Sequence, residues 1–333
     1  MILSRRLVLA GLSATALRPA RAQSARFAAA FDRARGLDQL HSLVIAQRGT
    51  IAAAEALRGT PIDRPANIKS VSKTIVATLT GIAIDAGHIP GTAARLGDLA
   101  PALIPAAADP AVASITISDL LTMQAGLERT SGANYGDWVS SRNWVADALS
   151  RPMVAEPGSR MLYSTGSYHI LGAVLTEVTG KSLLTLAREG LGRPLGIDIP
   201  AWTRDPQGRY LGGNEMALSP LALIRIGEVF RNNGLHDGAR ILSESWVRTA
   251  LTPKTRSFFS GHDYGFGWFL YEARGHPVAY GRGYGGQMLF VLPSLDLTVA
   301  VTSDPTRPAR SEGYAGDLHR LLIETILPEA EAA

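Results

Sequence analysis

The chain has 333 residues, of which 46% are hydrophobic and 19% are charged. This length and composition provide enough apolar side chains for one large core or for two lobes that share an interface, which excludes an intrinsically disordered protein. The chain contains no cysteine. Disulfides, a cysteine nucleophile and thiolate metal ligands are therefore excluded as well.

The first 22 residues have the features of an export signal. Ser4-Arg5-Arg6 precedes the apolar run Leu7 to Leu17, and Ala20-Arg21-Ala22 supplies a small-x-small cleavage site. The paired arginines resemble the twin-arginine signal, which exports proteins that have already folded. Ordinary secretion and a buried N-terminal helix are the alternatives. We expect residues 1–22 to act as this signal and the mature protein to be periplasmic or secreted.

The charge balance argues against two classes of partner. The whole chain has 33 Lys and Arg against 29 Asp and Glu. Four of the arginines lie in the signal, so its removal leaves 33 − 4 = 29 basic residues against 29 acidic ones. A balanced mature chain gives no reason to expect nucleic acid or an anionic membrane as a partner. No later apolar run is long enough to span a bilayer, so we expect no stable membrane anchor.

In chain order, the pattern predicts a helix over residues 25–35, then strands at 43–46 and 51–54 around Arg48-Gly49. A buried helix is predicted over 71–86, ended by Gly87 and Pro90, with Ser70 at its beginning. Helical pieces broken by Pro and Gly follow at 117–124, 138–150, 167–179, 183–191, 220–232 and 244–251. Strands are predicted at 265–271, 288–292 and 297–302, and a helix over 317–327 closes the chain.

These elements predict one domain over residues 23–333 that is built as two lobes. The sheet needs both chain ends, so the α/β lobe takes residues 23–68 and 253–333. Residues 69–252 form a mostly helical lobe, which we interpret as a large insertion into one α/β unit.

The motif Ser70-Val71-Ser72-Lys73 lies where a loop enters the helix predicted over 71–86. A spacing of three puts Lys73 on the same face as Ser70, one turn on, so that a hydroxyl and an amine can share a proton. Backbone N–H groups at the start of the helix stabilise developing negative charge. Burial of Lys73 in this apolar stretch should lower its pKa from about 10.4 toward that of a neutral base. A helix cap with a solvated lysine is the alternative.

A second element is the turn Glu156-Pro157-Gly158-Ser159, which an extended stretch continues to Gly166. The turn can aim Tyr163 into a cleft, where its phenol could pass a proton from Ser70 to a leaving group. This role requires a nearby ammonium that lowers the phenol pKa from about 10. Core packing is the alternative interpretation of this tyrosine.

The third element is the glycine run Gly281-Arg282-Gly283-Tyr284-Gly285-Gly286-Gln287, which we expect to lead directly into an apolar strand. Such a strand lets substrate lie against bare backbone. One N–H in this run, together with that of Ser70, could form an oxyanion hole that lowers a barrier by roughly 3 to 4 kcal/mol.

Together the three elements resemble the serine β-lactamase and penicillin-binding-protein superfamily, nearest its class C and esterase branch. The likeness covers nearly the whole mature chain and includes the stretches 115–127, 168–172 and 264–268. It implies a β-lactamase/transpeptidase-like α/β (α+β) fold, with an antiparallel sheet flanked by N- and C-terminal helices. It also implies Ser70 as nucleophile, Lys73 as its activating partner and Tyr163 as the tyrosine of a Y-x-N element, with no metal or organic cofactor.

Two departures from the family pattern argue against a true β-lactamase. Thr165 stands where the family usually has Asn, and the third element lacks the Lys-Thr-Gly that holds a β-lactam carboxylate. The resemblance places the oxyanion N–H at Tyr284, within the register Gly283 to Gly285. The run ending in Gly286-Gln287, with Trp202 and Asp205-Pro206 upstream, is most similar to 6-aminohexanoate-dimer hydrolases and related esterases.

Other site types find less support. Gly281, Gly283 and Gly286 satisfy G-x-G-x-x-G, but a strand is expected after them instead of a phosphate-binding helix. Gly180-Lys181-Ser182 lacks the upstream glycine of a P-loop and is interpreted as a helix-ending turn. The sequence has no G-x-S-x-G, and its histidines show no metal-ligand spacing. Trp138, Trp144 and Tyr135 could line an acyl pocket, although packing in the helical lobe is the preferred interpretation.

We therefore expect a serine hydrolase that cleaves a small-molecule ester, amide or lactam through an acyl-enzyme on Ser70. Esters and linear amides are the preferred substrates. The alternatives are a β-lactamase or D-alanyl carboxypeptidase or D-aminopeptidase, and a non-catalytic penicillin-binding-like module.

Overall fold

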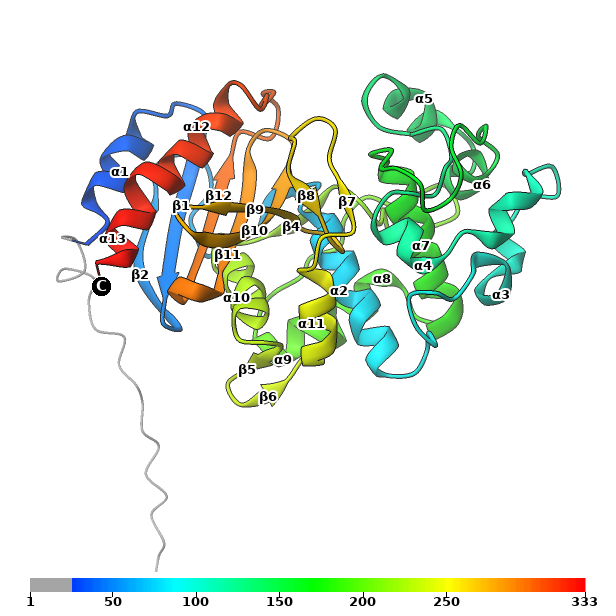
Figure 1. The fold of residues 1–333 in the computed structure, drawn as a ribbon, viewed down its shortest axis with the longest axis horizontal. Coiled ribbons are helices and arrows are strands. Elements are labelled where there is room, and N and C mark those ends of the chain that lie inside the picture. Colours follow the sequence, from blue (N-terminus) through cyan, green and yellow to red (C-terminus); the bar gives the residue numbers. More distant parts are fainter. Residues whose placement is uncertain (1–25, 333) are drawn as a thin grey trace, which may run out of the picture.

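The computed structural model describes residues 26–332, so the predicted export signal lies outside the described residues. Its main feature is an eight-stranded sheet with the order β2-β1-β12-β11-β10-β9-β8-β7, in which all neighbours are antiparallel (Figure 1). The strands are β1 (Leu40–Gln47), β2 (Thr50–Ala56), β7 (Thr255–Arg256), β8 (Asp263–Tyr264), β9 (Phe269–Ala273), β10 (His276–Gly283), β11 (Gln287–Leu292) and β12 (Leu297–Ser303).

Both ends of the chain build this sheet. Strand β1 pairs with β2 on one side and with β12 on the other, where Val44 lies opposite Ala300. Every residue of β11 and β12 is buried. Strands buried on both faces have continuous apolar runs, because helices cover the sheet from both sides.

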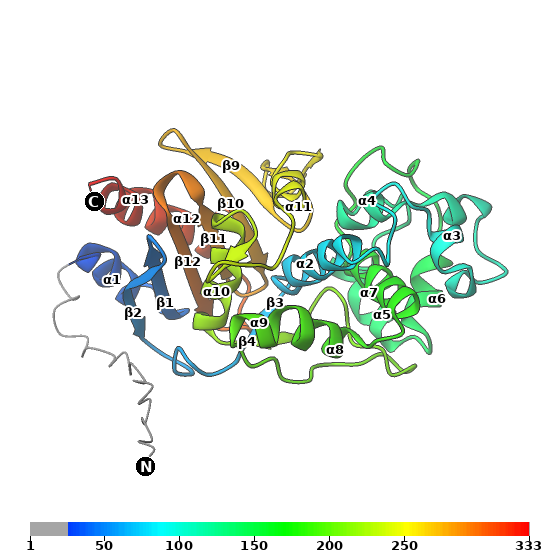
Figure 2. The same cartoon turned by 90° about the horizontal axis from the view of Figure 1, so that it is seen from below.

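The helices that cover the sheet come from distant parts of the chain. One face carries α1 (Ala28–Arg35), α12 (Tyr314–Leu321) and α13 (Leu327–Glu331), and the other carries α10 (Pro220–Arg231) and α11 (Glu244–Ala250) (Figure 2). A π-helical turn at Leu322–Ile326 joins α12 to α13. An ion pair of 2.6 Å between Arg33 and Glu324 links the first helix to this C-terminal segment.

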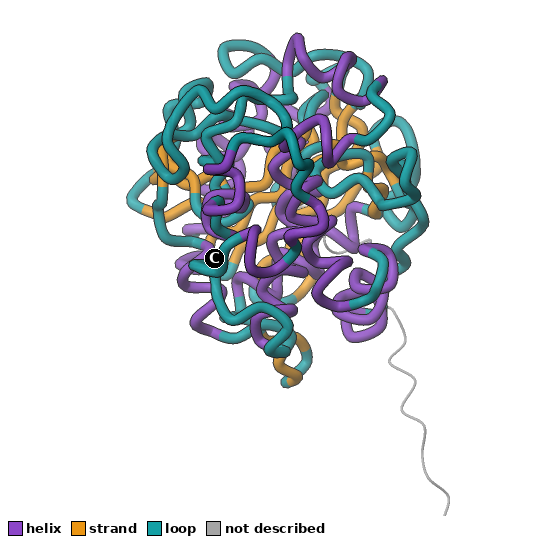
Figure 3. Tube along the Cα trace, turned by 90° about the vertical axis from the view of Figure 1, so that its right-hand side faces the viewer, coloured by secondary structure: helices purple, strands orange, loops and turns teal. Residues whose placement is uncertain are grey.

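The second lobe is helical and lies beside the sheet (Figures 1 and 2), so that it stands in front of the strands in the side view of Figure 3. Its helices are α2 (Ser72–Asp85), α3 (Leu96–Leu99), α4 (Ile117–Leu121), α5 (Tyr135–Ser140), α6 (Trp144–Leu149), α7 (Thr165–Thr179), α8 (Leu183–Ala187) and α9 (Arg193–Leu195). Shorter helical turns lie at Pro101–Leu103, Pro110–Ser114, Gly132–Asn134, Arg188–Gly192 and Pro293–Leu295. Two small two-stranded sheets complete the described structure: β3 (Ala66–Lys69) with β4 (Met216–Leu218), and β5 (Leu235–His236) with β6 (Ala239–Arg240).

Helix α2 connects the two lobes, because it packs against α7 of the helical lobe and against β10 of the sheet. Eleven of its residues are buried, so it is a core helix whose first turn faces the junction between the lobes. The residue that precedes it, Ser70, therefore lies where elements of both lobes meet.

The predicted fold class is confirmed: an α/β protein with an antiparallel sheet, flanking terminal helices and a helical insertion. The single helix predicted over 138–150 is wrong, since α5 and α6 are separate. The chain leaves the helix at Ser141, and the side chain of Asn143 starts α6 by accepting a hydrogen bond from the N–H of Ala146. Gly180 ends α7 with a φ of 66°, as expected for a helix-ending turn.

The glycine run leads into the apolar strand β11 at Gln287, as predicted, but its first three residues end a further strand, β10, that was not predicted. The chain turns at 284–286 between these two strands. Gly285 and Gly286 have φ values of 80° and 91°, which glycine adopts without strain. Strand β10 was not predicted, because its glycines and Pro277 interrupt the alternation of apolar and polar residues that is typical of a strand.

Among residues 26–332, no single helix has the length and apolar character needed to cross a membrane. Helix α7 reaches the required length and apolar character only when it is taken together with Leu183–Leu195. The axes of these two helical stretches meet at a bend of 82°.

Candidate active site

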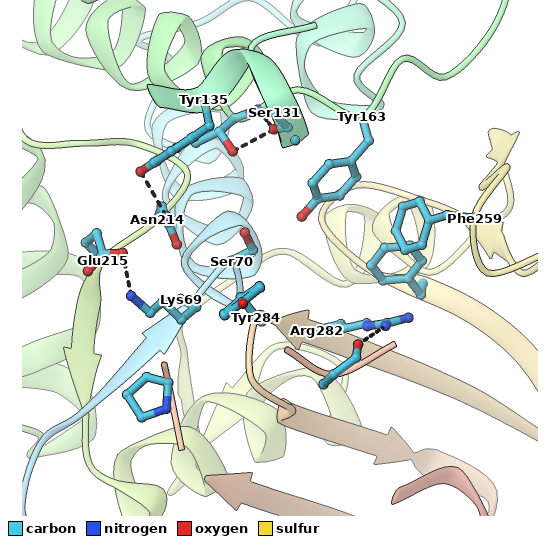
Figure 4. Close-up of a pocket in the computed structure, with 16 residues that line it drawn as sticks. Lys69, Ser70, Ser131, Tyr135, Tyr163, Asn214, Glu215, Phe259, Arg282 and Tyr284 are labelled. Carbon is cyan, nitrogen blue, oxygen red and sulfur yellow. Dashed lines mark hydrogen bonds and ion pairs between the residues drawn. The ribbon is translucent and has the colours of Figure 1, made fainter. Parts of the chain in front are cut away.

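A cavity of about 490 Å³ opens at the junction of the two lobes, and most of the predicted site residues line it (Figure 4). Its walls include the predicted residues Ser70, Tyr163, Thr165, Gly283 and Tyr284, together with Lys69, Ser131, Tyr135, Asn214, Glu215, Phe259, Phe269 and Arg282. Lys73 lies behind this wall, 2% exposed.

Ser70 is held in a sharp turn between β3 and α2. The preceding residue, Lys69, has a φ of 48°, a left-handed conformation that is uncommon outside glycine. Its backbone N–H donates to the side chain of Asn67 over 2.9 Å, and its ammonium pairs with Glu215 at 2.8 Å. These contacts fix the turn, so the hydroxyl of Ser70 is presented to the cavity at the start of the helix.

The amine of Lys73 has three partners. Its Nζ lies 2.9 Å from Oγ of Ser70, 2.7 Å from the carbonyl oxygen of Gly213 and 3.3 Å from Oγ1 of Thr165. Burial lowers the pKa of Lys73 from 10.5 to about 7. The predicted lowering is therefore confirmed, and the cause is removal of the ammonium from water.

Tyr163 reaches the same point from the other side of the cavity. Its hydroxyl forms a hydrogen bond with Ser70, and Nζ of Lys73 lies 5.0 Å from its ring centroid. Figure 4 shows the phenol oxygen pointing toward Ser70. The three predicted catalytic groups are thus brought together, although they come from a loop, a helix and a turn.

The predicted lowering of the Tyr163 pKa is wrong. Burial raises the pKa of this phenol, and this effect exceeds the opposing effects of its hydrogen bond to Ser70 and of the positive charge on Arg282. The expected ammonium is missing because Lys73 is itself forced toward its neutral form. Tyr163 is therefore a neutral hydrogen-bond donor, and the environment drives the pKa values of the amine and the phenol apart.

Thr165, at the first position of α7, connects the lysine to a residue that the sequence analysis missed. Its Oγ1 lies 3.0 Å from Oγ of Ser131, and the hydroxyl of Ser131 also accepts the backbone N–H of Thr165 over 2.8 Å. Ser131 lies in a loop before Gly132, in a pattern that does not differ from an ordinary turn. No signal in the sequence marks it as part of the site.

The end of β10 lies directly against the strand that leads to Ser70. A Cβ at Gly283 would overlap the carbonyl oxygen of Ile68 and lie 3.1 Å from Cβ of Lys69. The next residue, Tyr284, lines the same cavity as Ser70 (Figure 4). Gly285 does not line the cavity. It allows the turn, because a Cβ there would overlap the carbonyl oxygen of Asp304.

The backbone N–H groups of Ser70 and Tyr284 share a second property. Within residues 26–332, neither of them donates a hydrogen bond to a protein acceptor. Two N–H donors that have no acceptor and that flank a nucleophile are suited to bind a substrate oxygen.

Asn214 and Glu215 are further residues that the sequence analysis missed. They follow Gly213 in a loop, and Asn214 donates to the hydroxyl of Tyr135 over 3.0 Å. Tyr135 thus lines the cavity, as one of the two interpretations allowed.

Other candidate residues lie behind the cavity wall. Trp138 and Trp144 pack on each other with ring centroids 5.5 Å apart. Asp205 forms a fully buried pair of 3.1 Å with His169. Trp202, half-buried, packs on Tyr210. We therefore assign these residues to packing.

Residues 41–323 match the family model described as "Beta-lactamase". The chain belongs to the beta-lactamase family. The penicillin-binding protein 4 of Amycolatopsis lactamdurans is 26% identical over 301 residues, which cover 76% of this chain and 75% of that protein. Family membership supports a serine hydrolase of this superfamily.

Solved structures of beta-lactamase-like proteins share the fold. A Bacillus anthracis protein assigned as a 6-aminohexanoate-dimer hydrolase has a TM-score of 0.73 at 16% identity, covering 89% of this chain and 80% of that one. EstCE1, a hydrolase with promiscuous acyltransferase activity, has a TM-score of 0.73 at 19% identity, covering 94% and 98%. A penicillin-binding protein homologue from Caulobacter crescentus has a TM-score of 0.68 at 17% identity, covering 91% and 97%.

Within residues 26–332, no three His, Asp or Glu side chains gather in a group that could hold a metal ion.

Proposed function

We propose that this protein is a serine hydrolase that cleaves ester or linear amide bonds of small molecules through an acyl-enzyme on Ser70. The observation that carries the proposal is the distance of 2.9 Å between Nζ of Lys73 and Oγ of Ser70, with the amine buried and its pKa lowered to about 7. Such an amine is a base matched to neutral pH.

The hydrogen-bond capacity of Lys73 supports its role as the base. A neutral amine has two N–H donors and one lone pair. The two donors are accommodated by the carbonyl of Gly213 and the hydroxyl of Thr165, which leaves the lone pair for the hydroxyl proton of Ser70. As that proton moves to Lys73, Oγ of Ser70 bonds to the substrate carbonyl carbon, and the carbonyl π electrons move to the oxygen.

The negative oxygen that results is held by the N–H groups of Ser70 and Tyr284. Both donors have no acceptor in the described part of the chain, so they need no rearrangement to bind it. This arrangement supports Tyr284 as the register of the oxyanion hole, with Gly283 providing the close backbone approach.

Tyr163 supplies the proton for the second half of the step. Its neutral phenol is hydrogen-bonded to Ser70 and can donate to the leaving oxygen or nitrogen as the bond to the acyl carbon breaks. The protonated Lys73 returns a proton to the phenol oxygen. Water then attacks the acyl-enzyme by the reverse sequence, which releases the acid and regenerates Ser70.

A fluorophosphonate probe tests the proposal. It should label the wild-type protein at Ser70, fail to label Ser70→Ala, and label Lys73→Ala far more slowly. Equal labelling of wild type and Ser70→Ala would overturn Ser70 as the nucleophile. Absence of any labelling of folded wild type would favour the non-catalytic module.

Substrate class is tested by comparing p-nitrophenyl butyrate with nitrocefin. We rank esters and linear amides first, because Thr165 replaces the usual Asn and the third element has no Lys-Thr-Gly. The relative named penicillin-binding protein 4 keeps a β-lactamase or D-alanyl peptidase as the second candidate. Efficient nitrocefin turnover without ester hydrolysis would reverse the ranking.

We also propose that the protein is exported through its paired arginines, Arg5 and Arg6. Replacing both with lysine keeps the charge but should retain the protein in the cytoplasm if the twin-arginine route is used. Unchanged export of this variant, measured by cell fractionation, would favour ordinary secretion.

A further inference from the structure

The cavity has two chemically different ends, with Ser70 between them (Figure 4). One end is polar and is formed by Ser131, Tyr135, Asn214 and Glu215. The opposite end is aromatic and is formed by Tyr163, Phe259, Phe269 and Arg282. A substrate that spans the nucleophile therefore meets a different surface on each side of its scissile bond.

Phe259 is held in place although 42% of it is exposed. Its ring meets the ring of Tyr163 edge-on, with centroids 5.3 Å apart, and that of Phe269 at 5.7 Å. The guanidinium of Arg282 lies 5.6 Å from the centroid of the Phe259 ring. Phe259 thus connects the proposed proton donor to the aromatic end of the cavity.

Arg282 is itself held in place by residues 309–311, of which Ala309 also lines the cavity. Arg282 donates to Oγ of Ser311 over 3.1 Å and to the carbonyl oxygen of Ala309 over 2.8 Å. The cation is therefore kept close to the Phe259 ring, which favours one ring orientation. The exposed part of the ring remains available to a ligand.

The direction of the proposed reaction assigns the two ends. Tyr163 donates the proton to the leaving atom, so the leaving group must lie on the Tyr163 side of Ser70. This is the aromatic end. The acyl group then extends toward Ser131, Tyr135 and Asn214, where hydrogen-bonding groups predominate.

We propose that Phe259 is a specificity-determining residue that forms the wall of the leaving-group subsite, and that this subsite takes flat apolar groups such as aryl alcohols or aryl amines. This inference rests on the proposed function. The exposed face of Phe259 provides the aromatic surface for such a group.

The neighbouring residue Phe258 offers a matched control. It is 97% exposed and does not line the cavity, so Phe258→Ala removes an equal ring from the same loop without touching the subsite. Phenyl butyrate and ethyl butyrate are the paired substrates, because they share the acyl group. The ratio of variant to wild-type kcat/KM within each ester cancels their different intrinsic reactivities.

Phe259→Ala should lower kcat/KM for phenyl butyrate by about tenfold and for ethyl butyrate by less than about twofold. Phe258→Ala should change neither value. Phe259→Leu, which keeps apolar volume but not a ring, should fall between wild type and Phe259→Ala for the phenyl ester. Thermal melting of each variant checks that the fold is retained.

Equal losses of Phe259→Ala on both esters would overturn the inference, since they would show general support of Tyr163. The inference would also be overturned if Phe259→Ala left kcat/KM unchanged for both esters. It would be overturned as well if the loss in kcat/KM depended on the length of the acyl chain in esters that share one leaving group. In these cases hydrolysis still depends on Ser70, so the proposed function stands. Failure of the proposed function gives a different result. In that case the wild type hydrolyses neither ester, or it hydrolyses them at a rate that Ser70→Ala does not reduce.

Discussion

The carbonyl oxygen of Gly213 accepts a hydrogen bond of 2.7 Å from Nζ of Lys73. The contact joins a loop residue to a helix residue 140 positions earlier in the chain. This hydrogen bond is shorter than the 2.9 Å between Nζ and Oγ of Ser70. The loop at Gly213 therefore fixes the orientation of the Lys73 amine as much as Ser70 does. The position of the base is thus set by tertiary structure, although the S-x-x-K spacing is local.

The pH dependence of acylation should report Lys73. Because the pKa of its amine is lowered to about 7, kcat/KM should rise with pH through an apparent pKa near that value, as the protonated form loses its proton. Burial raises the pKa of Tyr163, so no decrease from this phenol should occur below about pH 10. Initial rates on an ester from pH 5 to 9.5, corrected with Ser70→Ala, check this. A flat profile would argue against Lys73 as base.

Lys73→Met should abolish activity and stabilise the fold. The unfolded lysine binds a proton up to its pKa of about 10.4. The folded one loses its proton at about 7. The unfolded state therefore binds more protons between these values, and the wild-type free energy of unfolding rises with pH across that window.

The increase in the free energy of unfolding that Lys73→Met produces should consequently be largest below pH 7, on the order of 1 to 3 kcal/mol. This increase should become smaller toward pH 10. This range is smaller than the full desolvation effect because Ser70, Thr165 and Gly213 lose a partner. Urea unfolding at pH 6 and pH 9.5 measures the difference. A destabilised variant at pH 6 would contradict the expectation.

Gly283→Ala should reduce kcat roughly 100-fold or more, because its Cβ would push the end of β10 away from Ile68 and displace the N–H of Tyr284. Gly136→Ala is the control. Gly136 lies in α5, where a Cβ would meet nothing within 4 Å. The prediction is checked by steady-state kinetics of both variants on p-nitrophenyl butyrate. Equal kcat values for the two variants would show that the N–H of Tyr284 is not part of the oxyanion hole.

Thr165→Val should lower kcat/KM about five- to tenfold, because it removes the hydroxyl that bridges Lys73 and Ser131 while keeping the side-chain volume. Thr165→Ser keeps the hydroxyl and should retain most of the activity. The comparison is made at pH 8.5, where Lys73 is neutral. Equal losses in the two variants would mean that the methyl group matters and the hydroxyl does not.

The parts of the site that lie within one local element could be predicted from the sequence. The spacing of Ser70 and Lys73 on one helix turn and the turn before Tyr163 needed only local pattern and the family resemblance. The sign of the Tyr163 pKa shift did not follow, because it depends mainly on how deeply the folded chain buries the phenol itself. Ser131 and Asn214 lie in loops without periodicity, so no pattern marks them.

The same distinction holds for the fold. Buried strands such as β11 and β12 have continuous apolar runs and were predicted nearly to their ends. Strand β10 was missed because Gly281 and Gly283 break its pattern. These glycines are required by close contacts, since a Cβ at Gly281 would lie 2.7 Å from Oγ1 of Thr74. The sequence of β10 therefore predicts a strand only weakly, because its glycines are needed where β10 packs closely against α2 and the segment before Ser70.

Strand β1, near the start of the chain, lies between β2 and β12, the last strand to be made. Ribosomes add roughly 5 to 20 residues per second, so the edge of β1 that β12 will cover stays bare for on the order of ten seconds or more during synthesis. Its apolar residues are then open to association with other nascent chains. The protein should accordingly depend on holding chaperones until translation is nearly complete, and truncation before β12 should yield aggregates instead of a smaller folded unit.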